Sequence, residues 1–379
     1  AAIMAKIKAN PLLKGIDAKK VKPRVMTLTQ STYDGVLYNT ETIKKMLDGY
    51  IPNLHFDEAW LPHAAFHPFY GTYHAMGKKR ERPLESMVYS TQSIHKLLAG
   101  ISQSLAGRVG RVELLPLSGA ELRAAGQAPS DLNTTLCQGG YPALYDRDVS
   151  PQDWFANYIA TYLERDVRQL IAVRDLAQFQ TFVKMCAART GQLLNLASLG
   201  ADCGINAVTA KQWLSVLEAS YIVTLLKPHH RNFGKRLVKA PKLYFCDVGL
   251  AAWLLGIRDA AALDTHAARG ALFETHVISE LMKQRLNAGQ PLDLYFWRDH
   301  VGHEVDVLIE HAQGLQALEI KSGSTFASDW TDGLKKWQKF AATESIQPSL
   351  VYGGTTSYVR EGLHVWGWQN IGDIAMGAG

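Results

Sequence analysis

The sequence lacks paired cysteines, long apolar runs and a large excess of either charge. Its four cysteines lie far apart, with no C-x-x-C pair, which excludes a zinc site built on paired cysteines and a secreted disulfide framework. We therefore expect a cytoplasmic protein. No stretch reaches the roughly 18 uncharged apolar residues of a membrane span, so the sequence predicts a soluble chain without a membrane partner.

Charge and apolar content limit the function classes. Lys and Arg total 40 against 35 Asp and Glu, a formal net charge of +5 over 379 residues, so any nucleic-acid surface must be local. A hydrophobic fraction of 47% is enough for two or three separate cores and excludes a disordered chain.

Turn residues and changes of pattern divide the chain into three regions. Residues 1–105 predict an α/β fragment in the order strand, helix, strand, strand, helix. Residues 106–260 predict a helical region with a winged helix at about 193–246, and residues 261–379 predict a small α/β domain. The expected fold class is therefore a mixture of α/β and α.

The first region places two chemically useful residues at strand ends. Asp57 ends the apolar strand of HFDEAW, and Lys96 in TQSIHK follows another strand. Ligands of α/β sheets sit at such strand ends, where a lysine can form a Schiff base and a carboxylate can hold a pyridinium nitrogen protonated. The alternative is that Asp57 is a turn residue and Lys96 a solvated helix lysine.

Three segments of this region favour the chemical interpretation. VKPRVMTLTQSTYDGVLYN, LHFDEAWLPHAAFHPFY and STQSIHKLLAGISQ closely resemble the pyridoxal-phosphate region of the ornithine/lysine/arginine decarboxylases, over about residues 8–103. The resemblance implies that Lys96 carries pyridoxal phosphate, that Asp57 faces its pyridine nitrogen, and that Ser93 and His95 lie near its phosphate. The family's main phosphate-binding turn and substrate domain have no counterpart here, so we expect no function from the fragment alone.

The second region has a helix-turn-helix pattern followed by a hairpin. A short helix at about 196–199, a turn at 203–205 and a helix from about Ala207 are expected. The second helix should expose Thr209, Lys211 and Gln212. Its buried face should hold Ala210, Trp213, Leu214 and Leu217, and we also expect Tyr221 to be a core residue.

The predicted wing is basic. Between Lys227 and Lys242 it has no acid, and His229, His230 and Phe233 are interleaved with the basic residues Lys227, Arg231, Lys235, Arg236, Lys239 and Lys242. Such a strip can neutralise phosphates of duplex DNA, with binding that falls steeply as salt rises. The alternative is a packing module or a surface for a protein partner.

The third region carries three acids and a lysine in a recognisable order. Glu274 lies on a helix, Asp306 in GHEVDVLIE, and Glu319 and Lys321 on one face of a strand in LEIKSG. Oxygen ligands such as Asp306 and Glu319 suit Mg²⁺, which activates water. The segment is similar to the restriction-endonuclease-like PD-(D/E)XK class, which implies a catalytic set of Glu274, Asp306, Glu319 and Lys321.

Two alternatives remain for this set: a surface strand with a salt-bridged Glu and Lys, or an endonuclease-like fold that no longer cuts. The nearby His300 and His303 fall short of a four-ligand zinc site, so we expect them to be solvated on a loop.

Residues 100–379 together resemble prokaryotic ATP-binding proteins in which an AAA-type ATPase domain precedes a C-terminal domain of unknown function. The order of ISQSLAGRVGRVELLPLSGAEL, YLERDVRQL, KLYFCDVGLAAWLLG and EIKSG carries this resemblance. The P-loop pattern is absent, because GTYHAMGKK has one residue too many and lacks the final hydroxyl. We therefore expect no ATP binding, with only the tail of the ATPase domain, around Arg108, preserved.

The two resemblances meet in LLAGISQSLAGR, so we interpret the chain as a chimera of two incomplete proteins. The leading hypothesis is the C-terminal part of an ATPase-associated protein, with DNA binding and a nuclease-like Mg²⁺ site. The rivals are a pyridoxal-phosphate decarboxylase fragment and a noncatalytic interaction module with a protein partner.

Overall fold

The structure is a computed structural model that divides into two compact units, residues 1–110 (unit 1) and residues 111–379 (unit 2). Within the part of the chain that it describes, no helix is both long and apolar enough to cross a membrane. The described residues are 25–29, 39–58, 86–91, 113–147, 149–162, 176–229, 238–311, 313–341 and 345–375.

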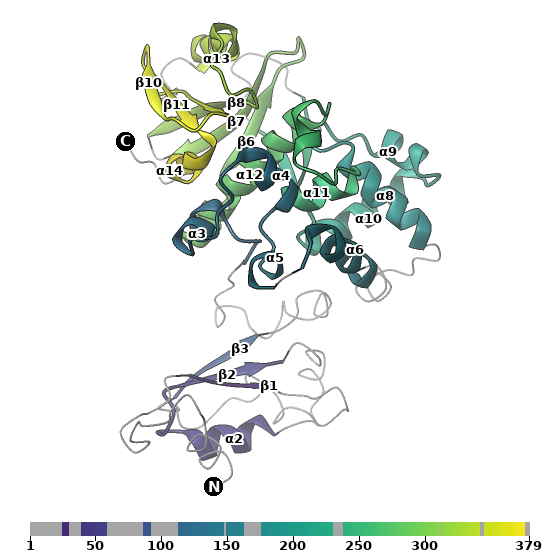
Figure 1. Ribbon diagram of the computed structural model, residues 1–379, viewed down its shortest axis with the longest axis vertical. Coiled ribbons are helices and arrows are strands. Elements are labelled where there is room, and N and C mark those ends of the chain that lie inside the picture. Colours follow the sequence, from purple (N-terminus) through teal and green to yellow (C-terminus); the bar gives the residue numbers. More distant parts are fainter. Residues whose placement is uncertain are drawn as a thin grey trace. The chain divides into compact units, whose positions relative to one another are not determined.

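Unit 1 contains a parallel sheet of three strands in the order β1-β2-β3. Its elements are β1 (Met26–Thr29), α2 (Thr40–Leu47), β2 (Asn53–Asp57) and β3 (Met87–Thr91) (Figure 1). Apolar residues of β2, which is paired on both sides, pack with the end of α2 in a small core. The predicted order of strand, helix, strand and strand is confirmed, and the helix predicted after Gln92 lies outside the described residues.

Unit 2 begins with helices and ends with most of its strands. Figure 1 shows α6, α8, α9 and α10 gathered on one side of unit 2, away from β10 and β11. The helices are α3 (Gly119–Ala124), α4 (Leu132–Gln138), α5 (Ala143–Asp146), α6 (Pro151–Thr161), α8 (Leu176–Ala187), α9 (Leu196–Asp202), α10 (Ala207–Ala219), α11 (Val248–Leu254), α12 (Arg269–Asn287), α13 (Asp332–Ala341) and α14 (Ile371–Ala375), with short 3-10 turns η6 (Ala261–Asp264), η7 (Ser328–Thr331) and η9 (Trp368–Asn370).

Eight strands of unit 2 form one mixed sheet in the order β10-β11-β9-β8-β7-β6-β4-β5. The strands are β4 (Val223–Pro228), β5 (Lys242–Phe245), β6 (Leu294–Arg298), β7 (Glu304–His311), β8 (Gly314–Lys321), β9 (Ser349–Tyr352), β10 (Tyr358–Arg360) and β11 (Leu363–Gly367). β4 and β6 pair in parallel, and β5 adds antiparallel to β4 at the edge. The hairpin that the sequence predicts as a wing is thus continuous with the large sheet.

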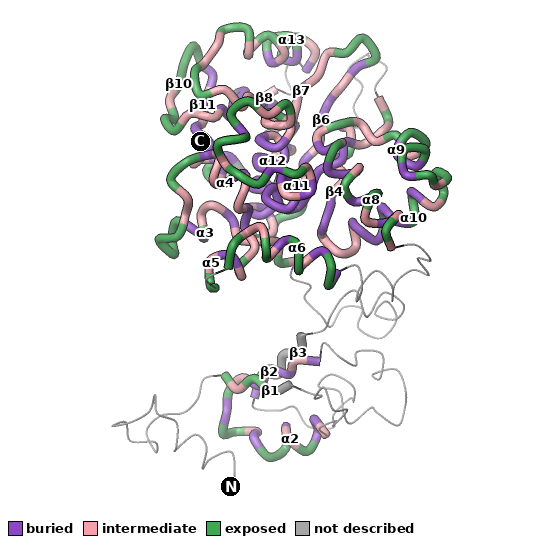
Figure 2. Tube along the Cα trace, turned by 45° about the vertical axis from the view of Figure 1, so that its right-hand side comes forward, coloured by how far each residue is buried: buried purple, intermediate pink, exposed green. Residues whose placement is uncertain are grey.

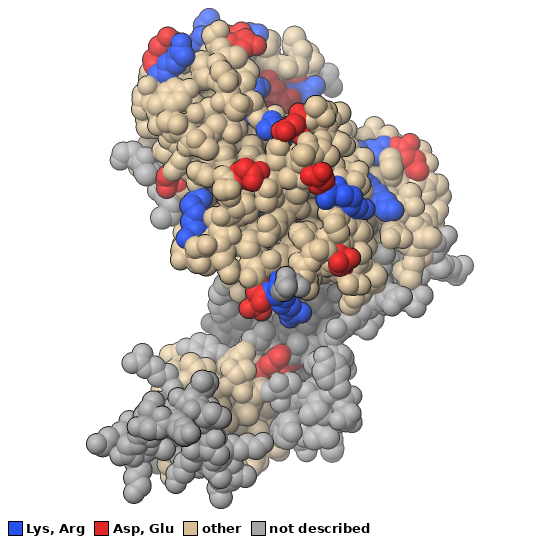
Figure 3. All heavy atoms as spheres, in the orientation of Figure 1, with Lys and Arg blue, Asp and Glu red and all other residues tan. Residues whose placement is uncertain are grey.

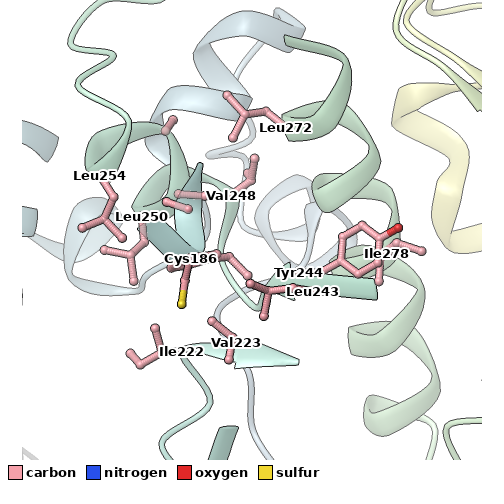
Figure 4. Close-up of a cluster of buried hydrophobic side chains, with 14 of the residues drawn as sticks. Cys186, Ile222, Val223, Leu243, Tyr244, Val248, Leu250, Leu254, Leu272 and Ile278 are labelled. Atoms are coloured by element: carbon pink, nitrogen blue, oxygen red, sulfur yellow. The ribbon is translucent and has the colours of Figure 1, made fainter. Parts of the chain in front are cut away.

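Helix α12 is the centre of unit 2, and Figure 2 shows it largely buried. It packs against α11, α14, β5 and β8. Its apolar side chains, among them Leu272 and Ile278, belong to a core shared by helices α8 and α11 and strands β4 and β5 (Figure 4). A second core, with Trp297 and Trp337 at its centre, lies between α13 and the sheet. The helical and C-terminal regions therefore fold around common apolar contacts.

A buried carboxylate fixes the junction of α4 and α11. Asp247 caps α11 by accepting a hydrogen bond from Leu250 N (2.9 Å), and its other oxygen accepts one from Gly140 N (2.7 Å). At Gly139 φ is +68°, and a Cβ there would lie 2.3 Å from Asp247 Oδ1. Glycine is therefore required where the end of α4 approaches the start of α11.

The predicted face of α10 is confirmed. Ala210, Trp213, Leu214 and Leu217 are all buried, and Trp213 packs edge-on against two phenylalanines of α8. Tyr221 differs from the prediction: it is only half-buried and has φ of +54°. The chain uses Tyr221 to turn from α10 into β4, so Ile222 and Val223 enter the core instead.

Candidate functional site

The predicted acids of the third region come together. Glu274 of α12, Glu304 and Asp306 of β7, and Glu319 of β8 form what we call the acidic cluster. Burial raises the pKa of Asp306 well above its usual range, and the negative charges of Glu319 and Glu274 raise it further. Such mutual shifts occur where carboxylates are held close together in a poorly solvated place.

A buried lysine already neutralises this cluster. Lys242 Nζ lies 3.0 Å from Glu274 Oε1 and 2.5 Å from Glu304 Oε1. Burial alone would lower the pKa of Lys242, but the carboxylates of Glu274, Asp306 and Glu304 raise it above its usual value. The lysine is therefore a buried ammonium ion bonded to two carboxylates.

Strand β5 positions this ammonium because alternate residues of a strand share a face. Lys242 and Tyr244 both reach Glu274, the second through its hydroxyl, which donates to Glu274 Oε1 at 2.5 Å. The carboxylate raises the pKa of Tyr244 further than burial alone does. Arg298 adds a second cation to Glu304, at 3.0 Å, so both oxygens of that carboxylate are paired.

Glu319 of β8 and Asp306 of β7 complete the cluster. Glu319 Oε1 accepts a hydrogen bond from Lys321 Nζ (2.6 Å), as expected for two residues on one face of a strand. Asp306 Oδ2 accepts one from the backbone N–H of Ile320 (2.8 Å). Glu319 Oε2 is buried without a hydrogen-bond partner. Three residues of the predicted catalytic set, Glu274, Asp306 and Glu319, thus lie in the acidic cluster, and the fourth, Lys321, is bonded to it through Glu319.

Closeness of the carboxylates does not by itself make a metal site. Among the described residues, no group of three or more His, Cys, Asp or Glu side chains is arranged to hold a metal ion. Binding of Mg²⁺ by Asp306 and Glu319 stays a prediction. Two lysines already pair with carboxylates here, Lys321 with Glu319 and Lys242 with Glu274 and Glu304.

The structure describes only part of the other predicted sites. Asp57 lies at the carboxyl end of β2, opposite Thr91 of β3, whereas Ser93, His95 and Lys96 lie outside the described residues. Glu58, next to Asp57, is buried and accepts a hydrogen bond from Ser90 Oγ at 2.5 Å. The carboxyl edge of this small sheet is therefore polar, as ligand sites of parallel sheets are.

Only some of the predicted nucleic-acid-binding residues lie in the described part of the chain. Lys211 and Gln212 are exposed on α10, and Lys239 is exposed before β5. Arg231, Lys235 and Arg236 lie outside the described residues.

Two members of the predicted basic strip face inward. His229 is buried, its Nε2 lies 3.1 Å from Glu310 Oε1, and its backbone N–H donates to Phe296 O. Lys242 lies in the acidic cluster. Neither can contact a phosphate, because β4 continues the sheet alongside β6 and β5 faces α12.

His303 is likewise more than a solvated loop residue. Its Nδ1 lies 2.8 Å from Asp299 Oδ2. The other oxygen, Asp299 Oδ1, accepts hydrogen bonds from three backbone N–H groups of the turn between β6 and β7.

Sequence reasoning missed Lys242, Tyr244 and Glu304 as members of the site. A usable signal was present: in PKLYFCD a lysine and a tyrosine alternate with core residues, which places both on one face of a buried strand. A charge inside such a strand requires a partner of opposite sign.

Three family models match different parts of the chain. Residues 1–108 match the Orn/Lys/Arg decarboxylase major domain. Residues 129–261 match a domain of unknown function (DUF8612). Residues 269–371 match a further domain of unknown function (DUF4143), a C-terminal domain associated with AAA-type ATPases.

Individual relatives agree with these matches. The uncharacterized protein Rv2008c of Mycobacterium tuberculosis is 35% identical over 226 residues, which are 59% of this chain and 49% of that protein. Lysine decarboxylase LdcA of Pseudomonas aeruginosa is 47% identical over 105 residues, 27% of this chain and 13% of the enzyme. The constitutive lysine decarboxylase of Escherichia coli is 48% identical over 77 residues, 20% of this chain and 10% of the enzyme.

The chain therefore spans about half the length of its mycobacterial relative and a small part of the decarboxylases. The crystal structure of protein VC1899 from Vibrio cholerae aligns over 93% of this chain and 95% of that one, with 12% identity and a TM-score of 0.23, too low to carry an argument. The chain thus joins a segment similar to amino-acid decarboxylases with segments similar to two domains of unknown function, and each family covers less than half of it.

The contacts of Lys242 predict a large difference between two lysines. Replacing Lys242 by Met should lower the free energy of unfolding by about 3–5 kcal/mol, because it removes the buried cation that pairs with Glu274 and Glu304, whose side chains are only 18% and 23% exposed. Replacing Lys321, whose side chain is 34% exposed, should cost no more than about 1 kcal/mol. Urea unfolding of both variants measures this, and equal losses would contradict the assignment of Lys242 as the central cation.

Proposed function

We propose that unit 2 is a binding module of an ATPase-associated protein and that it does not cleave nucleic acid. One observation carries this proposal: the ammonium of Lys242 is bonded to two carboxylates of the acidic cluster. An endonuclease-like arrangement that has lost its metal chemistry is one of the alternatives that the sequence leaves open.

A divalent cation at the acidic cluster would compete with the two lysines for carboxylate oxygens. If it used Glu319, that carboxylate would have to turn from Lys321. If it used Glu274 or Glu304, the buried ammonium of Lys242 would lose a partner. Mg²⁺ also requires oxygens at about 2.0–2.1 Å in near-octahedral geometry and gives up its water reluctantly. A preformed ion pair therefore disfavours metal binding at this cluster.

Duplex DNA is the partner that we favour. Lys211 and Gln212 are exposed on α10, the second helix of a helix-turn-helix pattern. Lys227 is exposed near the end of β4, and Lys239 is exposed shortly before β5. On the face of unit 2 seen in Figure 3, basic and acidic side chains alternate. Binding must therefore rest on a local set of cations, in the manner of a winged helix.

A reducing compartment is consistent with this function. All four cysteines are free, and three of them are buried. We propose that the protein acts in the cytoplasm.

DNA binding and cleavage are tested separately. We expect the wild-type protein to retard duplex DNA at ~50 mM salt and to lose affinity steeply as salt rises. Replacing Lys211, Lys227 and Lys239 by Ala should weaken binding to all sequences and reduce the log–log salt slope by up to roughly three, about one for each lost phosphate contact. Fluorescence anisotropy at several salt concentrations measures both.

Lys184→Ala, an exposed lysine of α8, is the matched control and should leave binding unchanged. Wild-type protein that leaves DNA free at ~50 mM salt would refute the DNA partner and leave a protein partner. Nicking of DNA with Mg²⁺ or Mn²⁺ that disappears in Asp306→Asn would refute the noncatalytic assignment and support the nuclease-like site.

For unit 1 we infer that the decarboxylase-like segment belongs to a fusion and does not turn over an amino acid. Decarboxylases of this kind depend on pyridoxal phosphate, which when bound supplies an electron sink. The position of Asp57 at the carboxyl edge of β2 fits a carboxylate that faces the pyridine nitrogen. By resemblance, Lys96 would hold the cofactor, with Ser93 and His95 at its phosphate. Among the described residues of unit 1, the buried core consists of Leu47, Ile51, Leu54 and Phe56, whereas a cofactor ring needs walls from several parts of a domain.

We expect no release of carbon dioxide from lysine, ornithine or arginine above a Lys96→Ala control when pyridoxal phosphate is added, because turnover needs an oriented ring and a substrate pocket. A radiometric assay with carboxyl-labelled amino acids measures this. Release that depends on Lys96 and falls in Asp57→Asn would instead identify unit 1 as a working lyase.

A further inference from the structure

A cavity of about 220 Å³ lies in unit 2, apart from the acidic cluster. The connection from α3 to α4, helix α12 and the start of α14 form its walls. Its apolar lining includes Leu122, Ala128, Pro129, Trp368 and Ile371. Because a cavity of roughly 150 Å³ can hold benzene, this one has room for one substituted ring.

One polar side chain in the wall, that of His276, has no hydrogen-bond partner among the described residues. His276 lines the cavity and is 6% exposed, and its ring makes no hydrogen bond with any residue that the structure describes. Burial lowers its pKa to about 4 against the opposing charge of Glu280. At neutral pH the imidazole therefore offers one N–H donor and one acceptor nitrogen.

Of the charged side chains around the cavity, Glu280 and Lys283 pair with each other, and Arg123 forms no ion pair within the described residues. Glu280 accepts hydrogen bonds from Gly119 N (2.8 Å) and from Lys283 Nζ (3.0 Å), so this buried pair neutralises itself. Arg123, also in the lining, is exposed. Within the described residues it has no ion-pair partner. The lining thus contains a buried neutral imidazole and an exposed guanidinium.

We propose that this cavity binds a small aromatic carboxylate that carries a hydroxyl group. The carboxylate pairs with Arg123, whose fork of donors suits it, and the ring lies against Trp368 and Ile371. The hydroxyl then exchanges a hydrogen bond with His276. This site is independent of the acidic cluster and of the DNA surface.

The probe is 4-hydroxybenzoate, titrated into the full chain by calorimetry and compared with two analogues that each lack one group. We expect 4-hydroxybenzoate to bind roughly tenfold or more tightly than 4-hydroxybenzamide, which lacks the charge, and more tightly than benzoate, which lacks the hydroxyl. Arg123→Met should abolish the first preference, and His276→Leu the second. Lys184→Met, a change of an exposed lysine on α8, should alter neither.

Ala128→Trp should fill the cavity without removing a polar group and should therefore abolish binding. Thermal unfolding of each variant serves as the control that it is folded. No heat of binding for 4-hydroxybenzoate at millimolar concentration would overturn the proposal. Equal binding in wild type and Ala128→Trp, or an unchanged preference for the carboxylate in Arg123→Met, would overturn it as well.

Discussion

The ammonium of Lys242 is the interaction on which the interior of unit 2 depends. It joins an edge strand, the central helix and the middle of the sheet, because its partners Glu274 and Glu304 come from α12 and β7. Neither the lysine nor the carboxylates would be stable in this place alone, since an unpaired buried charge costs several kcal/mol. Carboxylates that the sequence predicts as part of a metal site are in this way held together by the protein's own cation.

Much of this arrangement could be predicted from local patterns. Alternation placed Glu319 and Lys321 on one face of β8, and the helical period gave the buried face of α10. The partner of Glu274 could not be found in this way. Lys242 lies in a run of basic residues, a pattern that favours a solvated surface. It is part of the large sheet only because its strand, β5, pairs with β4, which in turn pairs with β6. Such pairing joins residues about 70 apart in the sequence, which local patterns do not report.

The two units differ in how far their sequence determines a function. Unit 1 resembles the decarboxylases closely, yet the matched segment is 13% of the relative LdcA, and the walls of a cofactor site come from several parts of a domain. Unit 2 has a large core and an eight-stranded sheet, but the families that match its segments are described only as domains of unknown function. Its chemistry must therefore be argued from side chains, and Lys242 is the most informative of them.

Titration of Mn²⁺ into the intact protein tests the central claim most directly, since Mn²⁺ favours the same oxygen ligands as Mg²⁺ and is visible by electron paramagnetic resonance. With Lys242 in the acidic cluster, we predict that wild-type protein and Asp306→Asn show the same weak, nonspecific uptake at millimolar Mn²⁺. Stoichiometric binding by the wild type that is lost in Asp306→Asn would contradict the claim, because it would mean that the acidic cluster binds a divalent cation although Lys242 is present.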